Sequence, residues 1–392
     1  MTTSVQAAIA LIKSAITGQV PVMPAEYSMK HAQRLLKEQG LLPIGFVAAT
    51  KCGYDQDEKL MKFLTDYYCM AVVQSEQQMQ QIQAICDAFE EAGIDYMPVK
   101  GAIMKTMYPS HELRSMSDAD ILIRQEQYSQ IQPIMERLGF TGVGESDHEY
   151  IWDSAYLRVE LHKRLMPTYH KDYYCYFGEG WDLAKTQNGY RWSMTEEDAY
   201  IYNFIHFAKH YRDGEGNCRF VIDLWVHQKC RPDMDMTYIR RRLAEMKMET
   251  FYNHILSVMQ AWFEDGPTNE VIEWITQVLF NIDKQEKEEV QAAAKSVHHI
   301  SNHGSEKKAK RNRLLSKIFP DRDHMNWSYP QWKKLPLAIA WILRWICLLF
   351  VRPETLKKNS KTPVITSQRS DSYREELAYV GLEFSDGVAL PD

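Results

Sequence analysis

The feature that most constrains the fold of this chain is a change in its hydrophobic pattern at Gly93. Before that glycine, apolar residues recur at helical spacing over residues 7–16, 29–39 and 59–93. After it, extended runs and helical segments alternate, at residues 95–99, 101–107, 120–123, 125–138, 150–152 and 156–162. This order predicts the α+β class, with a small mixed β-sheet core flanked by N-terminal and C-terminal helical regions.

The length of 392 residues exceeds the usual size of one domain and predicts several structural units. We expect an N-terminal helical region over residues 1–92 and the α/β core over residues 93–194. A helical domain over residues 195–305 follows, because Thr195-Glu196-Glu197-Asp198 is typical of a capped helix start. Residues 306–392 form a basic, aromatic-rich helical C-terminal region.

The charge is spread unevenly along the chain. Its formal net charge is -6, yet residues 306–361 hold 14 Lys and Arg against four Asp and Glu. A basic segment on an acidic body indicates either a partner that carries phosphates or an intramolecular docking surface. The run Lys307–Arg313 is more typical of a solvated surface, so nucleic-acid binding stays an open alternative.

Cysteine usage and the first residues indicate the compartment. The seven cysteines are scattered and form no C-x-x-C motif, which favours reduced thiols and argues against a cysteine zinc site. Residues 1–20 carry Lys13 inside their apolar stretch and lack the basic start of a signal peptide. We therefore predict a cytoplasmic protein.

One apolar run, over residues 335–351, raises the question of a membrane. It contains Pro336 and, near its centre, Arg344, which would cost roughly 3 kcal/mol on insertion into a bilayer. The run therefore predicts a buried helix, and binding to a membrane surface is not favoured.

Two carboxylates stand at the start of the most strand-like run of the core. Asp118 and Asp120 flank Ala119 and lead into Ile121-Leu122-Ile123. Because side chains alternate along a strand, both aspartates share one face and Ala119 takes the other. The like charges repel each other, which is typical of a site for a divalent cation, and Mg²⁺ prefers carboxylate oxygens and phosphates as ligands.

A third carboxylate comes from a later strand. In Val159-Glu160-Leu161-His162, Glu160 and His162 share one face, while Val159 and Leu161 face the core. We expect His162 to hydrogen-bond to a metal ligand rather than to bind the metal itself.

Helical segments after the core carry further candidates. His206 and His210 are spaced to share one helix face, yet no third ligand in register accompanies them. We expect them to be helix residues beside the site, in contact with a ligand or with metal-binding groups. Arg219 and Asp223 are spaced for a salt bridge within one helix.

The motifs together resemble the family of uncharacterised bacterial nucleotidyltransferases, a branch of the polymerase-beta-like superfamily. The residues that carry the resemblance are Val99-Lys100-Gly101, Tyr108-Pro109, Leu113 to Asp120, and Val159 to His162. It extends through Ile205-His206, His210, Arg219 and Asp223-Leu224, and through Phe319-Pro320, Tyr329-Pro330, Pro336 and residues 341–345. It covers most of the chain from about residue 60 onward.

The resemblance implies a Mg²⁺-dependent nucleotidyltransferase, with Mn²⁺ as the alternative ion. Asp118, Asp120 and Glu160 would be the catalytic and metal-binding residues. A nucleoside triphosphate would donate its nucleoside monophosphate to an acceptor hydroxyl on a small molecule, a protein or an RNA end, and pyrophosphate would leave.

The resemblance also implies that Lys100, Gly101, Arg114 and Ser117 bind the nucleotide and its phosphates. One departure from the superfamily pattern is Ala102, which stands where a serine or a glycine usually follows the glycine of the phosphate turn. A non-catalytic nucleotide-binding or regulatory protein with the same fold is therefore the alternative. A D-x-D glycosyltransferase is disfavoured, because it would need a larger α/β domain before Asp118.

Overall fold

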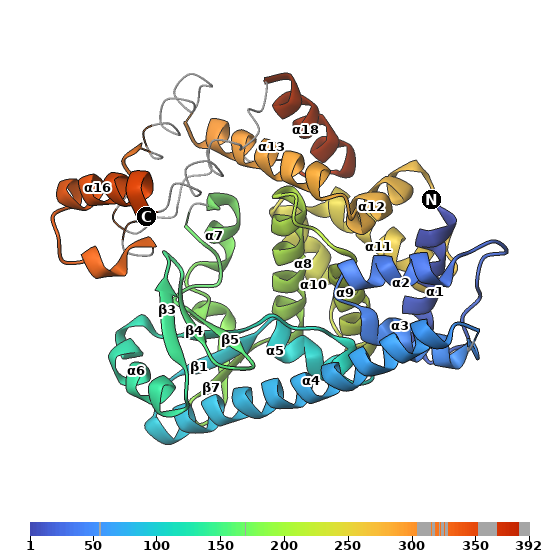
Figure 1. The fold of residues 1–392 in the computed structure, drawn as a ribbon, viewed down its shortest axis with the longest axis horizontal. Coiled ribbons are helices and arrows are strands. Elements are labelled where there is room, and N and C mark those ends of the chain that lie inside the picture. The colour runs from blue at the N-terminus through green and yellow to red at the C-terminus, as the bar shows by residue number, and fades with distance from the viewer. Residues whose placement is uncertain are drawn as a thin grey trace.

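The described residues form one seven-stranded mixed sheet, with helices before and after it in the chain, which confirms the predicted α+β class (Figure 1). The computed structural model describes residues 1–54, 56–168, 170–303, 315, 318–320, 322, 325, 328–351 and 367–383. The strand order is β3-β4-β5-β2-β1-β7-β6, and the pairs β2–β5 and β1–β7 are parallel. The other neighbouring strands pair antiparallel.

The strands are β1 (Tyr96–Val99), β2 (Asp118–Ile123), β3 (Thr141–Glu145), β4 (Glu149–Asp153), β5 (Arg158–His162), β6 (Ala184–Asn188) and β7 (Arg191–Met194). The helices up to the end of the sheet are α1 (Thr3–Thr17), α2 (Met29–Glu38), α3 (Leu42–Lys51), α4 (Glu58–Ala92), α5 (Gly101–Met104), α6 (Tyr128–Arg137) and α7 (Lys171–Phe177). Those after it are α8 (Glu196–Arg212), α9 (Cys218–Cys230), α10 (Met236–Glu245), α11 (Glu249–Phe263), α12 (Glu270–Phe280), α13 (Lys284–His303), α16 (Leu337–Ile346) and α18 (Ser367–Val380).

The long helix α4 connects the N-terminal helices to the sheet (Figure 1). At a rise of 1.5 Å per residue, its 35 residues span roughly 50 Å. It begins where the Asp57 side chain accepts a hydrogen bond from the backbone N–H of Leu60. It ends at Gly93, which has a φ of 69° and so adopts the left-handed conformation that glycine favours. The change in sequence pattern at this residue is therefore a true helix end.

The two faces of the sheet have different partners. Ala119, Ile121 and Ile123 of β2 pack, together with Val159 and Leu161 of β5, in the core beneath α4 and α6. The alternate residues of the same strands face the opposite side, toward α8. Strand alternation had predicted this division, and it leaves the carboxylates on the face that α4 does not cover.

Three strands were not predicted from the sequence. They are β6 and β7 at one edge of the sheet and β3 at the other. The β6–β7 hairpin joins the sheet through one parallel pairing, of Arg191 with Tyr96 on β1. The strand β3 forms the far edge, and it contains Gly142 and Gly144, which weaken the sequence signal of a strand. These strands therefore form because they pair with neighbouring strands, although their own sequences do not predict a strand.

The first helix after the sheet begins where the sequence predicts. The Thr195 hydroxyl caps α8 by accepting a hydrogen bond from the Asp198 backbone N–H. α8 then stands between the sheet and the other helices (Figure 1). The larger hydrophobic core combines residues of α1, α8 and α11 with Met97, Val99 and Leu122 of the sheet. The division of the chain into four units stays a prediction, and this core has members in all four, since Tyr373 and Leu377 of α18 belong to it as well.

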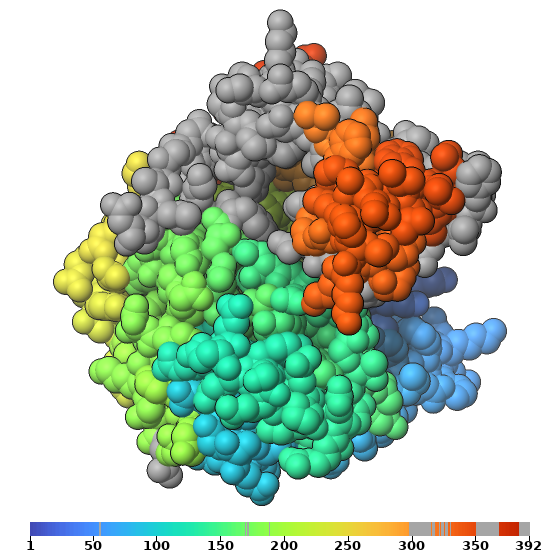
Figure 2. Space-filling model, turned by 90° about the vertical axis from the view of Figure 1, so that its left-hand side faces the viewer, coloured from blue at the N-terminus to red at the C-terminus, as the bar shows by residue number. Residues whose placement is uncertain are grey.

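The C-terminal helix α16 lies on the outside of the molecule (Figure 2, orange-red). Ile339, Ile342 and Ile346 are about half exposed, so the prediction of a buried helix is wrong for this face. The buried side is fixed instead by Trp341 and Trp345, whose indoles donate hydrogen bonds to backbone carbonyls of residues 320 and 318. Within the described part of the chain, no helix has both the length and the apolar character needed to cross a bilayer. The basic run Lys307–Arg313 lies outside the described residues.

Candidate active site

A cavity of about 450 Å³ lies between the carboxylate-bearing face of the sheet and the helices α8 and α9. Its lining includes every residue that the sequence analysis singled out for the site: Lys100, Gly101, Arg114, Ser117, Asp118, Asp120, Glu160, His162, His206 and His210. The strand register explains part of this gathering, because Asp120 on β2 stands opposite Glu160 on the parallel neighbour β5. Carboxylates, histidines and lysines thus meet in one cavity.

Asp120 is the most constrained of the three carboxylates. It is 4% exposed, and its Oδ1 accepts hydrogen bonds from Lys100 Nζ and from His162 Nε2, each at 2.8 Å. Burial alone would raise the pKa of Asp120, but Lys100 and His162 outweigh it and hold that pKa well below the ordinary value. The charge of Asp120 is therefore balanced within the protein, by a lysine and a histidine.

Lys100 is held in place by an unusual backbone. Its φ of 47° and ψ of -119° belong to a region that glycine normally occupies, at the turn between β1 and α5. Such a conformation costs on the order of 1–3 kcal/mol and is typical of functional positions. Burial disfavours the ammonium, but the nearby Asp120, Tyr202 and Glu160 outweigh burial and raise the pKa of Lys100. The side chain therefore stays charged inside the cavity.

The other two carboxylates are more accessible. Asp118 begins β2, and its Oδ1 accepts a hydrogen bond from the Ser117 hydroxyl at 2.8 Å. Glu160 Oε2 lies 3.7 Å from His162 Nε2, and its side chain is 20% exposed. Asp120, Glu160 and His162 can each offer one ligand atom within 4.8 Å of the others. Asp118 lines the same cavity but belongs to neither group of potential metal ligands found among the described residues.

The Gly101 turn is packed closely against two side chains. A Cβ at position 101 would lie 3.1 Å from Arg114 Nη1 and 3.2 Å from Met116 Sδ, so only glycine fits without displacing them. Ala102, the next residue, is 4% exposed in the core beneath α4 and does not line the cavity. A hydroxyl at position 102 would therefore point into the core in this conformation.

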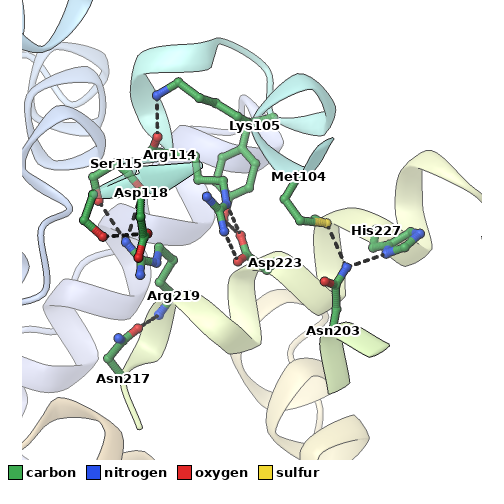
Figure 3. Close-up of polar contacts among 12 residues, drawn as sticks. Met104, Lys105, Arg114, Ser115, Asp118, Asn203, Asn217, Arg219, Asp223 and His227 are labelled. Atoms are coloured by element: carbon green, nitrogen blue, oxygen red, sulfur yellow. Dashed lines mark hydrogen bonds and ion pairs between the residues drawn. The ribbon is translucent and has the colours of Figure 1, made fainter. Parts of the chain in front are cut away.

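Arg114 forms an ion pair with α9, the helix on the opposite side of the cavity from the sheet (Figure 3). Its Nε and Nη2 donate to the two carboxylate oxygens of Asp223 on α9, at 2.9 and 2.8 Å, and the Tyr108 hydroxyl donates to the same carboxylate. The predicted salt bridge of Arg219 with Asp223 is therefore wrong, because Asp223 points at Arg114. Arg219 instead donates through Nη1 to the backbone carbonyl and the hydroxyl of Ser115.

The wall formed by α8 presents His206, Lys209 and His210 to the cavity. The ring centroids of His206 and His210 are 4.4 Å apart, and His210 Nδ1 lies 3.1 Å from Glu215 Oε2. Burial, together with the cations Lys100 and Lys209, holds the pKa of His206 well below its ordinary value. His206 is therefore a neutral ring on the wall of the cavity.

Sequence reasoning missed several residues of the cavity. Glu149 begins β4 and His148 directly precedes it, whereas Asn203, Lys209 and Asn217 come from α8 and the loop after it. A signal existed for Glu149, because it begins an extended segment that pairs with β5, where it stands opposite His162. Lys209 lies on the helix face of His206, one turn further along α8.

The fold and the cavity together indicate a protein that binds charged ligands. Its mixed sheet carries carboxylates and histidines that are suited to cations. A family model described as "Uncharacterised nucleotidyltransferase" matches residues 26–264. The chain therefore belongs to that family of uncharacterised nucleotidyltransferases. The C-terminal part of the resemblance, from residue 319 onward, lies beyond the matched residues. Comparison with curated proteins and with solved structures found no match.

Proposed function

We propose that this protein is a Mg²⁺-dependent nucleotidyltransferase of the polymerase-beta-like superfamily, which transfers a nucleoside monophosphate to an acceptor hydroxyl. The observation that carries the proposal is the register of β2 and β5, which sets Asp120 opposite Glu160 on the wall of a cavity that also holds Asp118. Family membership supports the reaction class.

The donor chemistry of the cavity fits a hard divalent cation. The oxygens of Asp118, Asp120 and Glu160 would hold Mg²⁺, and the nearby His162 nitrogen makes Mn²⁺ acceptable as well. When bound, the ion would neutralise charge on the triphosphate and make the α-phosphorus more electrophilic.

The protein's own residues would position and deprotonate the reactants. Lys100 and Arg219 bring positive charge to the cavity wall, and with Ser117 and the Gly101 turn they would hold the phosphates. Arg219 would take the role expected of Arg114, whose guanidinium is paired with Asp223. Glu160, the partly exposed carboxylate, would take the proton of the acceptor hydroxyl. The acceptor oxygen would then bond to the α-phosphorus as the bond to the β-phosphate oxygen breaks, and pyrophosphate would leave.

The ion pair of Asp120 with Lys100 favours the second candidate, a nucleotide-binding protein without turnover. Asp120 Oδ1 already accepts two hydrogen bonds, so a lysine supplies part of the charge that a metal ion would supply. In that case the nucleotide would bind equally well without a divalent ion.

Calorimetric titration with each nucleoside triphosphate separates the two candidates. The first predicts binding that needs Mg²⁺ and is weakened at least about tenfold in Asp118→Asn, because one charged ligand is lost. Asp153→Asn, on the exposed end of β4 outside the cavity, is the matched control and should bind as the native chain does.

Pyrophosphate release with candidate acceptors completes the test. Binding that persists in a chelator and ignores Asp118→Asn would reject metal-dependent transfer in favour of the second candidate. If no triphosphate binds under either condition, both candidates fail. The acceptor class, whether a small molecule, a protein or an RNA end, is open.

A further inference from the structure

A second group of potential ligands lies directly beside the first. His148, Glu149 and His162 can each offer one ligand atom within 4.8 Å of the others, and all three line the cavity. The backbone holds them together, because Glu149 is paired with His162 across the β4–β5 ladder. The rings of His148 and His162 have their centroids 5.7 Å apart.

The nitrogen Nδ1 of His162 marks this group as more than a hydrogen-bond network. His162 is 2% exposed, and its Nε2 is engaged with Asp120. Its Nδ1 is buried and has no hydrogen-bond partner among the residues that the structure describes. An unsatisfied buried polar atom costs about 1–3 kcal/mol, and an ion bound by Nδ1 would remove that cost. Because Nε2 donates to Asp120, Nδ1 is the ring nitrogen whose lone pair remains available to a ligand.

His148 is oriented as a metal-ligating histidine would be. Its Nδ1 lies 3.3 Å from the Ser146 hydroxyl, and its Nε2 lies 3.0 Å from Glu149 Oε2. Metal-bound histidines usually have one ring nitrogen fixed by a polar neighbour while the other binds the ion. Here Ser146 takes that neighbouring role, and Nε2 and the Glu149 carboxylate point at each other.

We propose that His148, Glu149 and His162 form a binding site for a divalent transition-metal ion of the zinc class. Two imidazoles and one carboxylate are a set that zinc accepts in sites with an open fourth position, and the cavity supplies access to that position. The set is softer than the carboxylates beside it, which suit Mg²⁺. His162 then serves both groups, with Nε2 on Asp120 and Nδ1 on the new site.

This proposal does not depend on nucleotidyl transfer, and its test measures only metal binding. The full chain, stripped with a chelator, is titrated with Co²⁺ while its visible absorption is recorded, and with Zn²⁺ by calorimetry. We expect one high-affinity ion per chain and ligand-field bands typical of nitrogen and oxygen coordination. Proton release should accompany binding where the ligands lose protons.

Two crossed variants locate the ion. Glu149→Gln should weaken the affinity for Zn²⁺ at least about tenfold, since a ligand charge is lost. Glu160→Gln, whose side chain touches the proposed site only through His162 at 3.7 Å, should weaken Zn²⁺ binding much less than Glu149→Gln does. His148→Gln removes another proposed ligand, at a half-buried position, and should weaken Zn²⁺ binding in the same way. Thermal melting verifies that each variant is folded.

Three outcomes would overturn the proposal. The native chain fails to bind one Zn²⁺ or Co²⁺ ion tightly, or Glu149→Gln and His148→Gln bind it unchanged while folded. In the third outcome, Glu160→Gln loses the ion as fully as Glu149→Gln does, which would assign it to the group of Asp120 and Glu160. None of these results bears on triphosphate binding, so the two proposals fail separately.

Discussion

At the scale of single residues, the candidate site depends on charges that are buried and compensated nearby. Asp120 is ionised because Lys100 and His162 contact it, although burial opposes its charge. Removing Asp120 would leave Lys100 buried and unpaired, which is far more costly than removing the accessible Asp118. Asp118 is therefore the better position for separating function from folding.

A histidine of the cavity gives the protein a testable pH dependence. The pKa of His206 lies well below its ordinary value because of burial and the nearby Lys100. Since an unfolded histidine has a pKa of about 6.5, the unfolded chain binds a proton that the folded chain excludes. Its contribution to stability is therefore fully present above about pH 6.5 and is lost as the pH falls.

We expect the melting temperature to fall from about pH 7 to pH 5, and to fall less steeply in His206→Phe, which keeps the ring contact with Phe220. His210 and His227 also have lowered pKa values and act in the same direction. His162 has a raised pKa, so its contribution is present below about pH 6.5 and is lost as the pH rises. Identical slopes for the native chain and His206→Phe would show that His206 is not the titrating group.

At the scale of elements, α8 determines which groups face the carboxylates. It carries Asn203, His206, Lys209 and His210 along one side of the cavity. Its start is fixed by Thr195, whose hydroxyl accepts from the Asp198 backbone N–H at 3.1 Å and donates to the Asp198 carboxylate at 3.0 Å. The N-terminus of α8, which directly follows β7, is thus fixed by the side chain of Thr195.

Thr195→Ala should lower the free energy of unfolding by about 1 kcal/mol, because the first turn of α8 loses its capping acceptor. Thr195→Ser keeps the hydroxyl and should remain close to the native value. Urea unfolding of the three proteins measures the difference. A Thr195→Ser variant as unstable as Thr195→Ala would assign the loss to the methyl group and not to the cap.

At the scale of the whole molecule, a buried ion pair joins the sheet side of the cavity to its helical side. Arg114 and Asp223 are 109 positions apart in the chain, and both side chains are 8% exposed. Arg158 and Asp153 form the same two-bond arrangement on the surface, with side chains 49% and 35% exposed. The molecule thus contains a matched pair of interactions that differ mainly in burial.

Asp223→Asn should cost about 3–5 kcal/mol, since it leaves the Arg114 guanidinium buried without its counter-ion. Asp153→Asn should cost less than about 1 kcal/mol, because water solvates the exposed Arg158. Chemical unfolding of both variants tests the contrast. Similar costs for the two would mean that burial does not govern the Arg114 pair.

The accuracy of the sequence predictions follows from how local each signal is. The end of α4 at Gly93 and the start of α8 at Thr195 are confirmed, because caps involve residues a few positions apart. The pairing of Arg219 with Asp223 is wrong for the opposite reason. Helical spacing allows that contact, but the packing of α9 against the Tyr108 loop offers Asp223 a better partner in Arg114.

The sequence by itself determined that Asp118 and Asp120 share a face, and that Glu160 and His162 do so on a second strand, because strand geometry fixes alternation locally. Only the tertiary structure decided that β2 and β5 are neighbours and that Lys100 neutralises Asp120. It also brought His148 and Glu149 to His162. Strand order and register depend on the packing of the whole chain, since a strand can satisfy its own hydrogen bonds with many neighbours.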